Sequence, residues 1–153
     1  MSSIDVDTGT VRVERTFDAS VEAVFDAWTN PEVLKRWWKP DPSREVTVAA
    51  LDVRPGGDYR LVMHRPDGED LVVHGTYREV ARPDRLVYSW QWEGTGPNAN
   101  HESEVAVTFV EAAPGRTTVT IEHAGLLDDD SRTAHAHGWN GVLDSFARSG
   151  IAA

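Results

Sequence analysis

The sequence predicts an α+β domain in which a curved antiparallel sheet of seven strands wraps around one long C-terminal helix. Two short helices are expected between the first and second strands. Segments that alternate apolar and polar residues occur after these short helices in an unbroken series with hairpin-length connections, which favours an antiparallel sheet. The 153 residues suit one domain, which we assign to residues 11–153, with residues 1–10 as a flexible lead-in.

The first strand and the two short helices follow from local signals. Residues Val11–Phe17 alternate apolar and polar side chains, as a half-buried strand does. Ser20 is a good N-cap for a first helix, and the apolar residues after it recur at helical spacing. Pro31 ends that helix, because the residue before a proline is disfavoured in the helical region, and it begins a second helix that reaches about Trp38.

Six more strands and a long helix complete the chain. The turn segments "PDGED", "RPD" and "APG" separate strands, and Gly94–His101 has the composition of a flexible loop. The strands are expected at Glu45–Val53, Gly57–Arg65, Leu71–Ala81, Asp84–Gly94, Ser103–Ala112 and Arg116–Ala124. A helix over about Asp129–Arg148 would be about 30 Å long, which is enough to cross a whole sheet.

Composition excludes several classes of partner. The net charge of −10 and the pI near 4.9 disfavour binding to nucleic acid or to anionic membrane surfaces. No apolar run approaches the roughly 20 residues that cross a bilayer, so no membrane insertion is expected. The chain has no cysteine, which excludes disulfides and thiolate chemistry and suits the cytoplasm.

The side of the sheet that should face the long helix is rich in aromatic residues. Tyrosine and tryptophan combine a flat apolar body with one polar atom, which suits a site for a ring-bearing ligand. The same residues could instead fill a core, with their polar atoms bonded to backbone or water. The predicted ligand-binding residues are Trp37, Tyr59, Met63, Tyr77, Tyr88, Trp90, Phe109, His123, His135, Trp139 and Leu143.

Two of these residues are histidines that should point inward. His123 is in register with Ile121 on its strand, and His135 lies one helical turn before Trp139. A buried neutral imidazole can orient a ligand carbonyl or act as a general base. Alternatively, each is a core histidine satisfied by hydrogen bonds, in the case of His123 to Tyr77 or to the helix.

Other catalytic and metal-binding patterns are missing from the sequence. His135 and His137 point to different faces of a helix, and no spacing typical of a zinc site occurs, so neither a metal nor a cofactor is expected. Ser89 and Ser103 lie on strands rather than at a nucleophile elbow. No pair of inward carboxylates is evident, and "RPGGDY" reads as a tight turn rather than a phosphate cradle.

Five motifs in order resemble a known superfamily. They are "ERTFDASVEAVFDAWTNPEVLKRWWKP", "LDVRPGGDYR", "PDG", "HGTYREVARPDRLVYSWQW" and "HGWNGVLDSF", which run from Glu14 to Phe146. The chain resembles the START-like superfamily, also called SRPBCC or the birch-pollen-allergen fold. Within that superfamily it is most similar to the family of the C-terminal domain of the activator of the heat-shock chaperone ATPase.

This resemblance implies a helix-grip fold with a cavity between the sheet and the long helix. Related members bind lipids, polyketides, hormones and other apolar molecules there, and some perform cyclase or dehydratase chemistry. Eukaryotic chaperone activators also carry a separate chaperone-binding domain, for which this chain has no room. In the resembled fold the two short helices close one end of the cavity. We therefore expect one of Trp37 and Trp38 to plug the sheet and the other to border the entrance.

Three hypotheses about function follow. The leading one is binding of a small hydrophobic or aromatic molecule in the cavity, without catalytic machinery. The second is an enzyme of the cyclase or hydrolase kind, with His123 or a pocket tyrosine as acid and base. The third is modulation of a chaperone ATPase through a protein partner. Both a monomer and a homodimer are compatible with the sequence.

Overall fold

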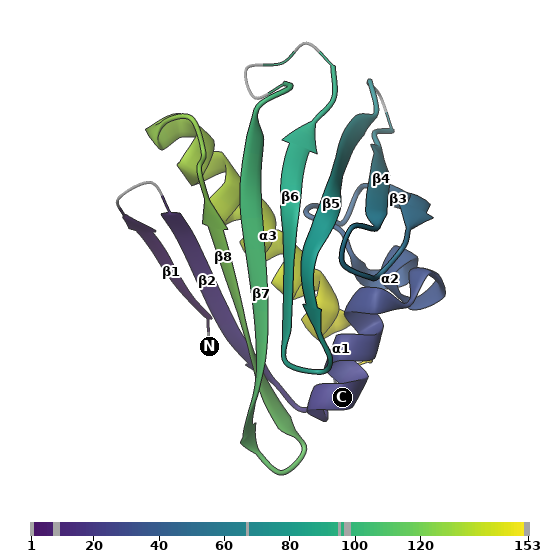
Figure 1. The fold of residues 1–153 in the computed structure, drawn as a ribbon, viewed down its shortest axis with the longest axis vertical. Coiled ribbons are helices and arrows are strands. Elements are labelled where there is room, and N and C mark those ends of the chain that lie inside the picture. Colours follow the sequence, from purple (N-terminus) through teal and green to yellow (C-terminus); the bar gives the residue numbers. More distant parts are fainter. Residues whose placement is uncertain (1, 8–9, 67, 95, 97–98, 152–153) are drawn as a thin grey trace.

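The computed structural model describes residues 2–7, 10–66, 68–94, 96 and 99–151, and these form one sheet and three helices (Figure 1). The strands are β1 (Ser2–Asp7), β2 (Thr10–Phe17), β3 (Glu45–Leu51), β4 (Asp58–His64), β5 (Leu71–Ala81), β6 (Arg85–Trp92), β7 (Glu102–Ala113) and β8 (Arg116–Ala124). The helices are α1 (Val21–Thr29), α2 (Pro31–Trp37) and α3 (Asp129–Arg148).

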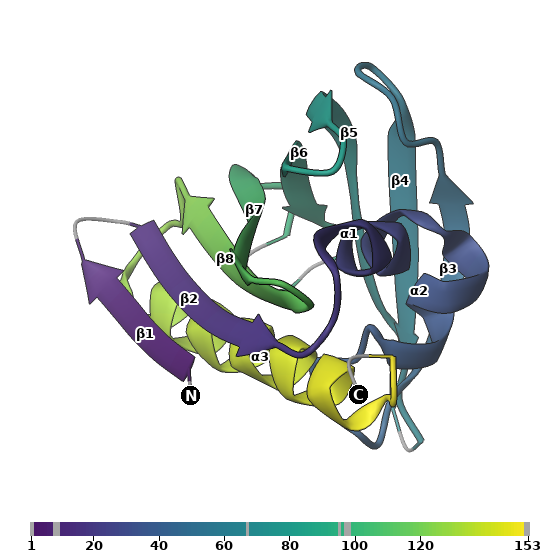
Figure 2. The ribbon, with the colours of Figure 1, turned by 90° about the horizontal axis from the view of Figure 1, so that it is seen from below.

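The strands form a single antiparallel sheet in the order β1-β2-β8-β7-β6-β5-β4-β3. The sheet curls around α3, which crosses its concave face (Figure 2). The short helices lie against the same face, with α2 in contact with β3 and α1 in contact with β7 and β8. All seven predicted strands are present, and the bounds of β5, β8 and α3 agree with those predicted. The predicted helix-grip fold is therefore confirmed.

An eighth strand, β1, lies in the segment expected to be a lead-in. It pairs with β2 from Ser2 opposite Arg15 to Asp7 opposite Thr10. The sequence Ile4-Asp5-Val6-Asp7 does alternate apolar and acidic residues, but over too few positions to stand out. Without β1, the backbone groups on one side of β2 would be an unpaired edge, so pairing with the N-terminal segment satisfies them.

Each helix begins with a side chain that caps its first turn. The side-chain oxygens of Ser20, Asn30 and Asp128 accept hydrogen bonds from backbone N–H groups at 3.2, 3.0 and 2.8 Å. These caps satisfy donors that have no partner within the helix. They fix where the short helices start, and so fix the directions of the tryptophans that α1 and α2 carry.

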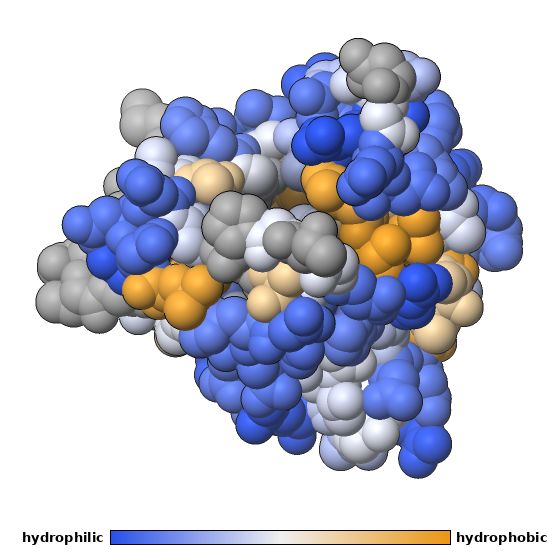
Figure 3. Space-filling model, turned by 90° about the horizontal axis from the view of Figure 1, so that it is seen from above, coloured by the Kyte–Doolittle hydropathy of each residue, from blue (hydrophilic) through white to orange (hydrophobic). Residues whose placement is uncertain are grey.

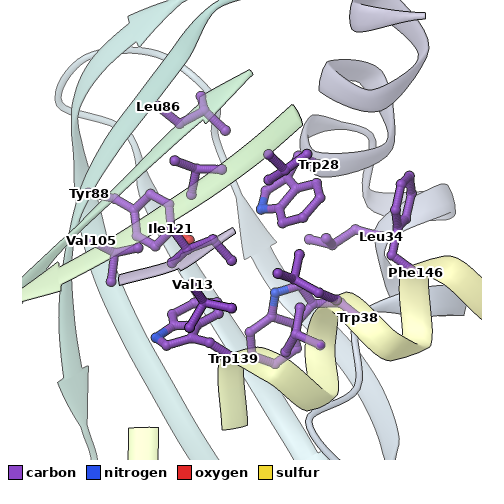
Figure 4. Close-up of a cluster of buried hydrophobic side chains, with 14 of the residues drawn as sticks. Val13, Trp28, Leu34, Trp38, Leu86, Tyr88, Val105, Ile121, Trp139 and Phe146 are labelled. Carbon is purple, nitrogen blue, oxygen red and sulfur yellow. The ribbon is translucent and has the colours of Figure 1, made fainter. Parts of the chain in front are cut away.

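One end of the fold is closed by packed aromatic rings. Trp37 is fully buried, its ring centroid lies 4.4 Å from that of Trp28 and 4.8 Å from that of Phe146, and its indole N–H donates to the Ala27 carbonyl at 3.0 Å. Trp37 is thus the tryptophan that plugs the sheet. Figure 4 shows side chains from the sheet, the short helices and α3 meeting in this core, among them Tyr88, Trp28, Trp38, Trp139 and Phe146.

Segment 38–44, which joins α2 to β3, is held against α3 by a close approach at a glycine. A Cβ atom on Gly141 would lie 2.1 Å from the Pro40 carbonyl oxygen, so only glycine permits this contact. Ser145 of α3 adds a hydrogen bond from its hydroxyl to the Trp37 carbonyl at 2.5 Å. Within the described part of the chain, no helix has the length and apolar character needed to cross a membrane.

Candidate functional site

A cavity of about 730 Å³ opens at the end of the molecule opposite the plug formed by Trp37. It lies between segment 38–44, the β4–β5 connection, the end of β6 and the middle of α3. Figure 3 views this end of the molecule and shows an apolar hollow ringed by hydrophilic residues. Its large apolar side chains are Trp38, Met63, Leu71, Trp90, Trp92, Trp139 and Val142. The volume falls within the range of small-molecule sites, about 300–1,000 Å³.

Four tryptophans from three parts of the chain make the aromatic wall. The Trp90 ring is central, with centroids 4.9 Å from Trp139, 5.5 Å from Trp92 and 6.3 Å from Trp38. Trp90 and Trp92 share one face of β6 because residues two apart on a strand point the same way. The wall therefore offers several flat apolar surfaces at different angles to a molecule inside the cavity.

His123 lies behind this wall in a closed chain of hydrogen bonds. The Trp139 indole N–H donates to Nδ1 of His123 at 2.9 Å, and Ser103 Oγ lies 2.7 Å from its Nε2. An indole N–H can only donate, so Nδ1 accepts and the neutral ring carries its proton on Nε2, which donates to Ser103. The Ser103 hydroxyl in turn donates to the Trp90 carbonyl at 3.3 Å. Every polar atom of the His123 ring is satisfied.

His135 repeats this arrangement at the cavity wall itself. The Trp92 indole N–H donates to its Nε2 at 2.9 Å, and its Nδ1 lies 2.7 Å from the Ser131 carbonyl oxygen one helical turn earlier. By the same reasoning the proton is on Nδ1, which donates to that carbonyl. The centroids of the two imidazole rings are 4.9 Å apart.

Burial and hydrogen bonding both favour the neutral form of His123 and of His135. Burial holds the pKa of His123 well below its ordinary value, and the neighbouring His135 lowers it further. Burial also lowers the pKa of His135, while the hydrogen bond to the Ser131 carbonyl opposes that shift. Protonation of either ring would turn its acceptor nitrogen into a second donor that faces an indole N–H, so the hydrogen bonds and the burial favour the same state.

Three tyrosines form a second cluster, separate from the large cavity. Tyr59, Tyr77 and Tyr88 have ring centroids 5.2–5.9 Å apart, and they border a void of only about 20 Å³. Burial raises the pKa of each phenol above its ordinary value. Gly75 makes room for this cluster, since a Cβ there would lie 2.7 Å from the Tyr59 ring. The cluster is packed core rather than part of an open site.

The predicted ligand-binding residues thus divide into three groups. Those that line the large cavity are Met63, Trp90, His135 and Trp139. Those beside the small void are Tyr59, Tyr77, Tyr88 and again Trp90. Those that are buried in the core and line neither space are Trp37, Phe109, His123 and Leu143.

Several cavity residues were not among the predicted ligand-binding residues. Trp38, not Trp37, borders the cavity, because Trp37 turns toward Trp28 and α3. Trp92 was expected on the inner face but not in the site. Arg44 lines the cavity from segment 38–44, where no periodicity indicates direction. The signal for Trp38 was its place beside Trp37, since one of the two was expected to border the cavity entrance, although the sequence did not indicate which.

The family model described as activator of Hsp90 ATPase homolog 1-like protein matches residues 18–149. The chain belongs to this family. The match runs from just before α1 to just after α3, so it includes every element that lines the cavity. The predicted family relationship is confirmed.

Solved structures of similar fold come from several bacteria. The AHSA1 protein from Silicibacter pomeroyi is 26% identical, with a TM-score of 0.79 over 90% of this chain and 94% of that one. A protein from Arthrobacter aurescens is 20% identical, with a TM-score of 0.82 over 97% and 90%. CalU16 from Micromonospora echinospora is 22% identical, with a TM-score of 0.67 over 97% and 83%. The last two show the shared fold alone. No curated protein matched the sequence.

Proposed function

We propose that the chain binds a small apolar or aromatic molecule in the cavity walled by Trp38, Trp90, Trp92 and Trp139. The observation that carries this proposal is a cavity of about 730 Å³ with an aromatic wall, in which Trp92 and Trp139 are held by hydrogen bonds to histidines. A wall that is already ordered loses little conformational freedom on binding, which favours affinity. Because the chain has no cysteine, we place its action in a reducing cytoplasm.

The arrangement of the histidines favours binding over catalysis. A general base needs a free lone pair within reach of the substrate proton. The lone pair of His123 accepts from Trp139 and that of His135 accepts from Trp92. The phenols of the tyrosine cluster lie beside the small void and have raised pKa values, which does not suit acid–base work near neutral pH.

Binding is tested by titration with phenylnaphthylamine, a neutral aromatic dye whose fluorescence rises in apolar surroundings. The blocking variant is Gly138→Leu, because Gly138 lines the cavity and a Cβ there meets only Pro40 Cβ, at 4.0 Å. Gly138→Ala controls for the loss of glycine. Ala147→Leu places a leucine at an exposed position of the same helix, away from the cavity.

We expect saturable binding by the wild type and by both control variants, and a loss of at least about 10-fold in affinity in Gly138→Leu. Circular dichroism of each variant reports whether the fold is retained. A wild type that binds no dye, or a folded Gly138→Leu that binds as tightly as the wild type, would contradict the proposal.

The family description makes regulation of an Hsp90-type ATPase a second candidate. It is tested by adding the purified chain to Hsp90 and measuring ATP hydrolysis. Stimulation that survives in Gly138→Leu would assign that activity to the outer surface rather than to the cavity. Unchanged hydrolysis at saturating protein would argue against this candidate.

A further inference from the structure

One cation at the cavity has a buried donor without an acceptor among the described residues. Arg44 lines the cavity, and its Nη1 atom is buried without a hydrogen-bond partner among the described residues. Two other cations near it in sequence are paired, since Lys39 lies 3.8 Å from Glu45 and Arg54 lies 2.8 Å from Asp52. Burying the Nη1 donor without an acceptor is unfavourable. A ligand with a negative group would correct this.

The acidic residues around the cavity do not supply that partner. Asp41 lines the cavity three residues before Arg44 and accepts from the backbone N–H of Ser43 at 2.9 Å and from its hydroxyl at 2.8 Å. These hydrogen bonds, and to a lesser extent the charge of Arg44, lower the pKa of Asp41, but Asp41 forms no hydrogen bond with Arg44 Nη1. Asp70 lies 3.2 Å from His64, and Glu93 forms two hydrogen bonds with Arg60. These carboxylates already have partners.

The remaining charged residues of the rim are exposed. Arg65 and Glu69 also line the cavity, but both side chains are open to solvent. Water satisfies an exposed charge at little cost, so neither residue needs a ligand. Salt screens charges that lie more than about 8 Å away, so most of the net charge of −10 has little effect on an anion inside the cavity. At contact distance, the Nη1 donor of Arg44 favours a ligand that brings an acceptor to it.

A second cavity-lining residue, Trp90, which also borders the small void, has an unsatisfied donor. Trp90 is 4% exposed, and its indole N–H has no acceptor among the described residues. Among the described residues that line the cavity, Arg44 and Trp90 each have a buried side-chain nitrogen without a partner, and both nitrogens are donors. Acceptor groups on a ligand would match them, and further donors would not.

We infer that the ligand is an acid: a flat apolar molecule with a carboxylate or a similar anionic group, which Arg44 anchors while the tryptophans hold the apolar part. This inference rests on the proposed binding function and specifies its ligand class. Arginine suits the role because its planar fork binds carboxylate-like groups through two parallel hydrogen bonds. The anion would lie beside segment 38–44, with the rings directed toward Trp90 and Trp139.

Two dyes that share one skeleton test the anchor. Anilinonaphthalene sulfonate carries an anionic group that phenylnaphthylamine lacks, so the ratio of their dissociation constants measures the contribution of that group. The test variant is Arg44→Gln, which removes the charge. The control is Arg36→Gln, which removes an equal charge from an exposed position on α2 outside the cavity.

We expect the wild type to bind the sulfonate about 10-fold or more tightly than the neutral dye, as a charge-assisted hydrogen bond allows. Arg44→Gln should bring the ratio of the two dissociation constants to about one, whereas Arg36→Gln should leave that ratio as it is in the wild type. The sulfonate should also lose affinity in Gly138→Leu, which locates it in the cavity.

The outcomes separate the anchor from the binding function. Equal affinity of the wild type for the two dyes, or a preference that persists in Arg44→Gln, overturns the anchor while binding of the neutral dye still supports the cavity. A wild type that binds neither dye overturns the binding function and the anchor together.

Discussion

A matched pair of variants, Trp139→Phe and Trp90→Phe, tests whether hydrogen bonds to imidazole hold the cavity wall. Both indoles are nearly fully buried, at 2% and 4% exposure, and their centroids are 4.9 Å apart. Each change removes a similar volume from the same region of core. Trp139 donates a buried hydrogen bond to His123, whereas the Trp90 indole N–H has no acceptor among the described residues.

The difference between the two variants gives the energy of the hydrogen bond. Trp139→Phe leaves Nδ1 of His123 as a buried acceptor without a partner, which costs about 1–3 kcal/mol. Trp90→Phe removes an unsatisfied donor and adds no such penalty. We expect Trp139→Phe to have a free energy of unfolding lower than that of Trp90→Phe by about 1–3 kcal/mol, and a Tm lower by about 2–4 °C for each kcal/mol.

Urea unfolding followed by far-ultraviolet circular dichroism measures this difference without relying on tryptophan fluorescence, which the substitutions alter. Equal unfolding free energies for the two variants, or a less stable Trp90→Phe, would refute the reasoning. The result would then mean that packing volume, and not the indole–imidazole bond, sets the stability of the wall.

Three other predictions concern the same region. Gly138→Ala should raise the unfolding free energy by about 0.5–1 kcal/mol, because the new methyl meets only Pro40 Cβ, at 4.0 Å. Gly141→Ala should lower the unfolding free energy by about 1–3 kcal/mol, because its methyl would lie 2.1 Å from the Pro40 carbonyl oxygen. A Gly141→Ala protein as stable as the wild type would mean that segment 38–44 can move away freely. The folded-state pKa values of His123 and His135 lie below their ordinary value of 6.5, so the unfolded chain takes up protons first as pH falls. The free energy of unfolding, measured with urea, should therefore decrease below about pH 6.5, by up to about 2.7 kcal/mol per pH unit if both histidines contribute. A stability that stays flat between about pH 7 and 5 would contradict the neutral buried pair.

Local patterns in the sequence were enough to predict the fold. Period-two alternation located seven strands, and capping residues located the helices, because both signals depend on neighbours in the chain. The same alternation identified the inner face of the sheet, and its residues Val107, Phe109 and Ile121 are all buried. β1 was missed because six residues with one short alternation give a weak signal.

The division of the inner face into core and cavity could not be predicted from alternation. Alternation gives the side of the sheet but not the position along the strand at which α3 and the sheet separate. Tyr77 and Trp90 have the same inward parity, yet the first borders only the small void and the second lines the cavity. Arg44 lies in an irregular connection, and its direction depends on the contact between Pro40 and Gly141.

The aromatic residues at the two ends of the helix grip are held in different ways. At the closed end, Trp37 donates to a backbone carbonyl and packs ring to ring, so it needs no polar side chain. At the open end, Trp92 and Trp139 donate to imidazoles, so the two histidine side chains hold these indoles in place. These hydrogen bonds are made within the protein and do not require a ligand. The main polar interaction left for a ligand is then with Arg44, so selectivity should depend on the acid group and affinity on the rings.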